Sequence, residues 1–130
     1  MRDLAEVMAD VADQDRGQWF DLVDPVTGEE TGMRFRMAGP DSATQHRAQL
    51  ALADELADLA GPDGRVSAAH REAARLRCLA ACVLGWEIVQ DGAAVPFSQA
   101  NVIRVLKLAK WIHVQVDGFA ADRAAFRSVA

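Results

Sequence analysis

The sequence predicts an α+β domain, mostly α, in which an N-terminal β-hairpin packs on a bundle of about four helices. Three observations support this prediction. The chain has 130 residues, of which 51% are hydrophobic, and this suits one domain with a sizeable core. Apolar residues alternate strictly with arginines at residues 33–37, as in a half-buried strand. Three later segments begin at a serine and continue with apolar residues at helical spacing.

Residues 1–17 are predicted to form an acidic N-terminal arm or a short helix, ahead of a single globular domain at residues 18–130. The apolar residues of this first segment share the spacing of one face of an amphipathic helix. They are Leu4, Val7, Met8 and Val11. Nine acidic residues and two arginines lie within residues 1–31, whereas the rest of the chain has ten acidic and twelve basic residues. The net charge of −5 is therefore concentrated at the N-terminal end.

A β-hairpin is predicted at residues 18–37. Trp19–Val23 forms one apolar-rich run, and Met33–Met37 forms the alternating one. Between them, residues 24–32 are rich in residue types that form turns. Because an isolated hairpin is only marginally stable in water, this one must pack on helices or on another chain.

Four helices are predicted after the hairpin, at about residues 42–60, 67–85, 98–110 and 112–127. Ser42, Ser67 and Ser98 stand at the starts of the first three, where a hydroxyl oxygen can accept a hydrogen bond from the first turn. Ser42 and Gln45 together fit a capping box. The helical spacing of the apolar residues in these segments implies that each helix presents one apolar side to a common core. The core residues expected from these patterns are Leu56, Leu76, Val83, Phe97, Val102 and Leu106.

The start of the fourth helix also fits a strand. Ile112, Val114 and Val116 alternate in the way of a strand, whereas Val116, Phe119 and Phe126 continue a helical spacing. A helix is favoured because the residues that follow are rich in alanine and in charged side chains.

The sequence shows no arrangement of residues typical of catalysis or of metal binding, so we expect neither an enzyme nor a cofactor. The three histidines (His46, His70 and His113) fall in different predicted helices, and no two have metal-ligand spacing. Cys78 and Cys82 lie four residues apart without a matching Cys/His pair, so we interpret them as small core residues that bind no metal and form no disulfide. No stretch approaches the length of a membrane span, and no dense basic run suggests nucleic acid, so a cytoplasmic protein is expected.

One pattern in the C-terminal half resembles a known family. It consists of Gly85-Trp86-Glu87, Asp91-Gly92, Val95-Pro96-Phe97-Ser98 and Asn101-Val102. The turn at Asp24–Glu29 and the helix start at Gly39–Ser42 also look like members of this group. The chain thus resembles the tail assembly chaperones of long-tailed bacteriophages and prophages over about three-quarters of its length.

The resemblance implies a function without catalysis. Such chaperones bind the tape measure protein, a long helical chain with apolar stretches, and keep it soluble until tail tube subunits polymerise around it. They then leave, so this protein would act in the host cytoplasm and would be absent from the mature virion. The implied partner is therefore a helical protein, with no nucleic acid, membrane or cofactor involved.

Six residues are candidates for partner binding: Trp86, Phe97, Arg104, Lys107, Lys110 and Trp111. Trp111 is the expected exposed anchor because it follows the apolar stripe of the third helix. The three basic residues are spaced three apart along the predicted helix, so they form one positive face. That face could contact the acidic N-terminal segment of another copy, which is the basis for expecting self-association.

Two other functions fit the same sequence features. The first is a structural neck or tail protein of the virion, of the connector or terminator type, which would form a closed ring. The second is a bacterial protein-interaction domain that has no connection with phages.

Overall fold

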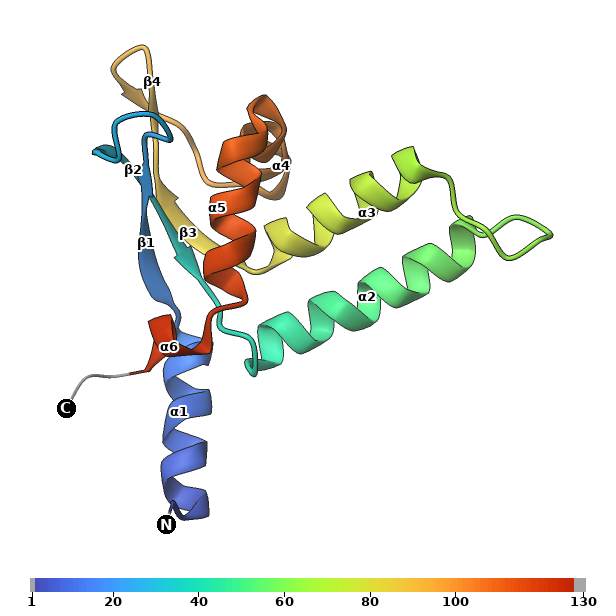
Figure 1. Ribbon diagram of the computed structural model, residues 1–130, viewed down its shortest axis with the longest axis horizontal. Coiled ribbons are helices and arrows are strands. Elements are labelled where there is room, and N and C mark those ends of the chain that lie inside the picture. The colour runs from blue at the N-terminus through green and yellow to red at the C-terminus, as the bar shows by residue number, and fades with distance from the viewer. Residues whose placement is uncertain (1, 128–130) are drawn as a thin grey trace.

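The computed structural model describes residues 2–127 (Figure 1). Over this range the protein has an α+β fold that is mostly helical, and its N-terminal part contributes a hairpin to an antiparallel sheet. The helices are α1 (Leu4–Arg16), α2 (Ala43–Leu59), α3 (Ala68–Ala81), α4 (Gln99–Leu108), α5 (Lys110–Ala120) and α6 (Arg123–Phe126). The strands are β1 (Gln18–Val23), β2 (Glu30–Met37), β3 (Val83–Glu87), β4 (Val89–Gln90) and β5 (Ala93–Ala94). The predicted class, the N-terminal hairpin and the helix within residues 1–17 are confirmed.

The sheet extends the predicted hairpin by one strand. Its order is β1-β2-β3, and both neighbouring pairs are antiparallel. Phe20 on β1 lies opposite Phe35 on β2, which in turn lies opposite Trp86 on β3. A row of aromatic side chains therefore crosses the sheet at its centre.

The hairpin turn is held by the Asp24 carboxylate, which accepts a hydrogen bond from the backbone N–H of Val26 at 2.8 Å.

Strand β3 begins where a helix was predicted. The helix expected to reach residue 85 ends at Ala81, because the N–H of Cys82 donates to Leu79 and its carbonyl accepts from Ala38 at 2.9 Å. The residues that follow then pair along the edge of β2. Val83 is β-branched and Gly85 is a weak helix former, so a partner strand outweighs one more helical turn.

The C-terminal helices are also divided differently from the prediction. Ala109 has an extended backbone (φ −150°, ψ 139°), which ends α4 and starts α5 at Lys110. A second interruption, at residues 121–122, separates α5 from α6. Ile112 and Val116 are buried within α5, so the preference for a helix over a strand at residues 112–116 is confirmed.

Helix α5 covers the inner face of the sheet. The rings of Phe20 on β1 and Phe119 on α5 stack with centroids 4.9 Å apart. The side chain of Gln115 forms two hydrogen bonds with the backbone of Val23, accepting its N–H at 3.1 Å and donating to its carbonyl at 2.9 Å. These contacts fix the direction in which α5 crosses β1.

The helices form three groups rather than the single bundle that was predicted (Figure 1). Helices α2 and α3 run side by side as an antiparallel pair that projects from one end of the sheet, and an ion pair between Arg77 and Glu55 joins them. Helices α4 and α5 pack against each other beside the sheet. Helix α1 projects on its own, with α6 against its C-terminal end.

The core lies between the sheet, α5, α4 and the C-terminal half of α3. Leu76, Val83, Val102 and Leu106 are buried in one cluster, as predicted. Two members of the predicted core are not buried: Leu56 is half-exposed, and Phe97 is 45% exposed. Leu56 borders a hollow at the outer end of the α2–α3 pair, together with Val66 of the connecting loop and Arg71 of α3. In residues 2–127, no helix is long and apolar enough to cross a membrane.

Candidate partner-binding groove

A groove of about 770 Å³ runs between α3 on one side and α4 and the start of α5 on the other. It exists because α3 packs on α4 through its C-terminal half and then diverges from it toward its N-terminal end (Figure 1). The residues at the bottom are apolar and mostly small on the α3 side. They are Ala69, Ala73 and Leu76 from α3, and Ile103 and Leu106 from α4.

The sequence of α3 explains the open space. Ala69, Ala73 and Leu76 follow one another at intervals of four and three residues, so they lie on one face of the helix. Two of the three are alanines, whose side chains are too short to fill the distance to α4. Leu76 is buried at the closed end of the groove, where the two helices meet. The alanines therefore leave a trough instead of a packed helix interface.

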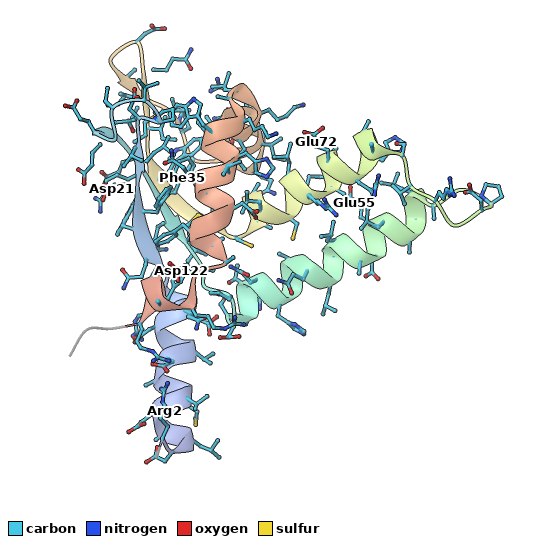
Figure 2. All side chains as sticks on the ribbon, in the orientation of Figure 1. Arg2, Asp21, Phe35, Glu55, Glu72 and Asp122 are labelled. Atoms are coloured by element: carbon cyan, nitrogen blue, oxygen red, sulfur yellow. The ribbon has the colours of Figure 1, made fainter. Side chains whose placement is uncertain are left out.

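Positive charge surrounds this apolar floor. Arg71, Arg75 and Arg77 line it from α3, while Lys107 and Lys110 line it from α4 and α5. Figure 2 shows Glu72 on the side of α3 turned toward α4, and this is the one acidic residue among the described groove residues.

Four of the five basic residues are free to meet a partner. Within residues 2–127, the side chains of Arg71, Arg75, Lys107 and Lys110 form no ion pair and no hydrogen bond. Arg77 differs because it pairs with Glu55 on α2. Such a rim attracts carboxylates, and it repels a second basic surface.

Two of the six predicted partner-binding residues lie in this groove, and a third does not. Lys107 and Lys110 line it. Arg104 lies outside it and faces β4, with its Nη1 atom 3.5 Å from Oε1 of Gln90. The predicted single basic face is wrong because the break at Ala109 places Lys110 on a different helix from the other two.

The predicted aromatic residues have mainly structural positions. Trp111 is half-buried and packs against the core, so it is not the exposed anchor that was expected. Trp86 is also half-buried, and its indole N–H donates to the carbonyl of Val95 at 2.9 Å. Phe97 sits edge-on to Trp86 with ring centroids 5.8 Å apart, leaving part of its own ring exposed.

The segment from Trp86 to Asn101, which carries most of the pattern that resembles tail assembly chaperones, thus connects β3 with α4. Besides the Trp86–Val95 bond, Nδ2 of Asn101 donates to the carbonyl of Pro96 at 2.9 Å. The hydroxyl of Ser98 accepts the N–H of Asn101 at 3.1 Å and so caps α4. These bonds fix where α4 starts relative to the sheet, and hence one wall of the groove.

The sequence analysis missed the contribution of α3. Arg71 and Arg75 are four residues apart, and the alanines at 69 and 73 have the same interval. On a helix an offset of two residues puts these two pairs on nearly opposite sides, so their spacing does not predict that both line one groove. What the spacing also could not show is that the alanines face α4 across an open gap.

The two cysteine side chains lie in or against the core. Burial raises the pKa of the Cys82 thiol to about 12, and burial also raises the pKa of Cys78, with Asp117 and Glu55 nearby as smaller causes. Both thiols are therefore protonated at neutral pH, and that of Cys82 donates to the carbonyl of Cys78. Among residues 2–127, no three His, Cys, Asp or Glu side chains come together in a way that could hold a metal ion.

Comparison of the chain with protein-family models, with curated proteins and with solved structures finds no match. A functional proposal therefore depends on the groove and on the sequence pattern described above. An apolar trough between two helices, with basic residues on both sides, is suited to an amphipathic helix about 10 Å wide that carries acidic residues beside its apolar face.

Proposed function

We propose that this protein is a tail assembly chaperone of a phage or prophage, which binds helical segments of the tape measure protein and keeps them soluble. The observation that carries the proposal is the groove between α3 and α4, with its apolar floor and a basic rim on which four of the five residues are unpaired. Its chemistry matches a client that is helical and exposes apolar surface. The resemblance of the sequence to tail assembly chaperones indicates that this client is the tape measure protein.

The physical basis is helix-in-groove recognition. A client helix would place its apolar residues against Ala73, Leu76 and Ile103, which removes apolar surface of both chains from water. Acidic residues of the client would lie beside Lys107 and Lys110. One such contact is weak, but many copies along one long client act together, since each bound copy covers another stretch that would otherwise aggregate.

This function needs neither a catalytic residue nor a cofactor. The protein would act in the cytoplasm of the host before the tail is complete, and it would be released as tube subunits take its place. Its contacts would be with protein, not with nucleic acid or a membrane, because the basic side chains border a narrow trough instead of an extended face.

The test is co-expression with the tape measure protein of the same phage. The wild-type chain should keep the client in the soluble fraction and should co-purify with it. The double variant Lys107→Glu, Lys110→Glu should bind the client at least about tenfold more weakly, because it reverses the charge on one side of the groove. Arg47→Glu is the matched control, since Arg47 is an exposed basic residue on α2 outside the groove.

Two results would contradict the proposal. A client that stays insoluble with the wild-type chain in excess excludes a chaperone for that client. Purified particles that contain this protein at a stoichiometric copy number favour the neck or tail virion component. Full client rescue by the Lys107→Glu, Lys110→Glu variant would remove the groove as the binding site and leave the chaperone function standing.

A further inference from the structure

We propose that helix α1 of one copy docks in the groove between α3 and α4 of a second copy. This inference goes beyond the proposed function, because it concerns contact between copies of this chain and does not require a client. It brings together two features that the fold leaves without a partner, the groove and the projecting helix.

Helix α1 has an apolar side that nothing in the described chain covers. Leu4 is 78% exposed and Met8 is 70% exposed, and the two lie one turn apart on the same face. Val7, which is 45% exposed, and Val11 lie on the same face, along the edge that borders a hollow next to α6. An amphipathic helix with an uncovered apolar stripe is what a helix-binding groove takes up.

The charges of the two features are opposite. Between residues 2 and 16 there are five acidic and two basic residues, so α1 is acidic overall. The groove has five basic residues and one acidic residue on its described lining. Docking would bring the net negative charge of α1 close to Lys107 and Lys110, whereas a basic helix would be repelled by those ammonium groups.

Helix α1 is also accessible along most of its length. Helix α1 contains 13 residues, which at 1.5 Å per residue is about 20 Å. It projects from the body for most of this length, so a second molecule can approach it from the side of Leu4 and Met8 (Figure 1).

The contact must join different copies. In Figure 1, α1 extends from one end of the sheet, away from α3 and α4, whose residues line the groove, so the helix cannot reach the groove of its own chain as folded. Each copy carries one α1 and one groove, and docking leaves a free α1 on one partner and a free groove on the other. Such a head-to-tail contact continues into a chain or closes into a ring.

Self-docking would also regulate client binding, and this consequence alone rests on the proposed function. The acidic, apolar α1 has the same chemistry as the client helix inferred above, so the two would compete for each groove. Copies would then mask their own grooves when no client is present, and a client would displace α1.

A complementation experiment tests the head-to-tail contact on the purified full-length chain. The variant Leu4→Asp, Met8→Asp loses the apolar face of α1 but keeps its groove. The variant Lys107→Glu, Lys110→Glu has an altered groove but keeps its α1. Each should be monomeric by light scattering at low salt, at about 0.1 mM protein, where a micromolar contact is nearly saturated. An equimolar mixture should form a 1:1 dimer and nothing larger, because only one intact α1 and one intact groove can meet.

The wild-type chain should form larger species, and its Kd should rise at least about tenfold between low and high salt, because opposite charges are screened. Val26→Asp is the matched control, since Val26 is 91% exposed in the hairpin turn and far from α1 and the groove in sequence. Melting curves verify that each variant is folded. If the aspartate pair disturbs α1, Met8→Gln removes apolar surface while keeping a good helix former and should still weaken association.

Three outcomes would overturn the inference. The wild-type chain could stay monomeric over the whole concentration range. The two variants could fail to combine when mixed, or association could persist in the Leu4→Asp, Met8→Asp variant. None of these bears on client rescue, so failure here and failure of the chaperone proposal are distinguishable.

Discussion

At the scale of single residues, Gln45 joins α2 to the rest of the fold. Its side chain is buried near the start of α2, and its amide Nε2 donates to two backbone carbonyls, Ala38 at 2.9 Å and Ala120 at 2.7 Å. These carbonyls belong to the end of β2 and the end of α5, which are far apart in the chain. The side chain therefore does not complete the capping box with Ser42 that its spacing suggested. It satisfies buried acceptors that a helix and a strand leave unpaired.

We predict that Gln45→Ala lowers the free energy of unfolding by about 2–4 kcal/mol, because it leaves two buried carbonyls without a donor and opens a small cavity. Urea unfolding of wild type and variant measures this difference. Gln49→Ala, on an exposed position of the same helix, is the control and should stay within about 0.5 kcal/mol of wild type. Equal losses in the two variants would mean that the buried amide of Gln45 does not determine the effect.

At the scale of elements, the segment from Trp86 to Asn101 sets the position of α4 relative to β3. The indole of Trp86 stands edge-on to both Phe35 and Phe97, with centroids 6.0 and 5.8 Å away, and its N–H bonds to the Val95 carbonyl. The pattern that resembles tail assembly chaperones is thus built of residues that hold the groove wall in place.

We predict that Trp86→Phe destabilises the chain by about 1–2 kcal/mol, because the Val95 carbonyl loses its donor while most of the apolar surface is kept. Hydrogen exchange should also speed up at the N-terminal turn of α4, which Ser98 caps. Trp111→Phe is a useful comparison, since no hydrogen bond of its indole ties α4 to β3. If exchange at the start of α4 is the same in both variants, the Trp86 bond does not position that helix.

At the scale of the whole molecule, Asp41 is the point where the two ends of the chain meet. Its carboxylate accepts two hydrogen bonds from the guanidinium of Arg123 on α6, at 2.8 and 2.9 Å, and another from Gln14 on α1 at 3.2 Å. The Arg123 hydrogen bonds are the main reason why the pKa of Asp41 lies below its usual 3.8, and Gln14 adds to the shift. The N-terminal helix, the start of α2 and the C-terminal helix are joined at this one carboxylate.

We predict that Arg123→Ala raises the pKa of Asp41 toward its ordinary value, as followed by NMR titration of the carboxyl carbon. Because the folded pKa is depressed, the contact stabilises the fold fully above pH 3.8 and is lost as the pH falls through the lower, folded value. The loss of stability in the variant should be small at pH 7, since the pair is exposed to solvent, and should vanish at lower pH. An unchanged Asp41 pKa in Arg123→Ala would show that the ion pair is not formed in solution.

The sequence by itself determined the elements whose signals are local. The alternation at Met33–Met37 predicted β2, since side chains of a strand point to opposite faces in turn. Ser42, Ser67 and Ser98 predicted three helix starts, and each hydroxyl accepts the expected N–H three residues on, at 3.1, 3.2 and 3.1 Å. Caps and periodicity act within one turn or one strand, so they can be recognised without knowing what lies nearby.

Only the tertiary structure decided the rest. Val83–Glu87 is a strand because β2 offers an edge to pair with, and Ala109 is extended because α4 and α5 pack against different parts of the core. The groove needed the same information, because its α3 wall and its α4 wall are separated in sequence by β3, β4, β5 and the loops around them. Lys107 and Lys110 could be selected from the sequence as basic residues, but their meeting with Arg71 and Arg75 depends on how α3 diverges from α4. Long-range packing brings these side chains together, and no local pattern records it.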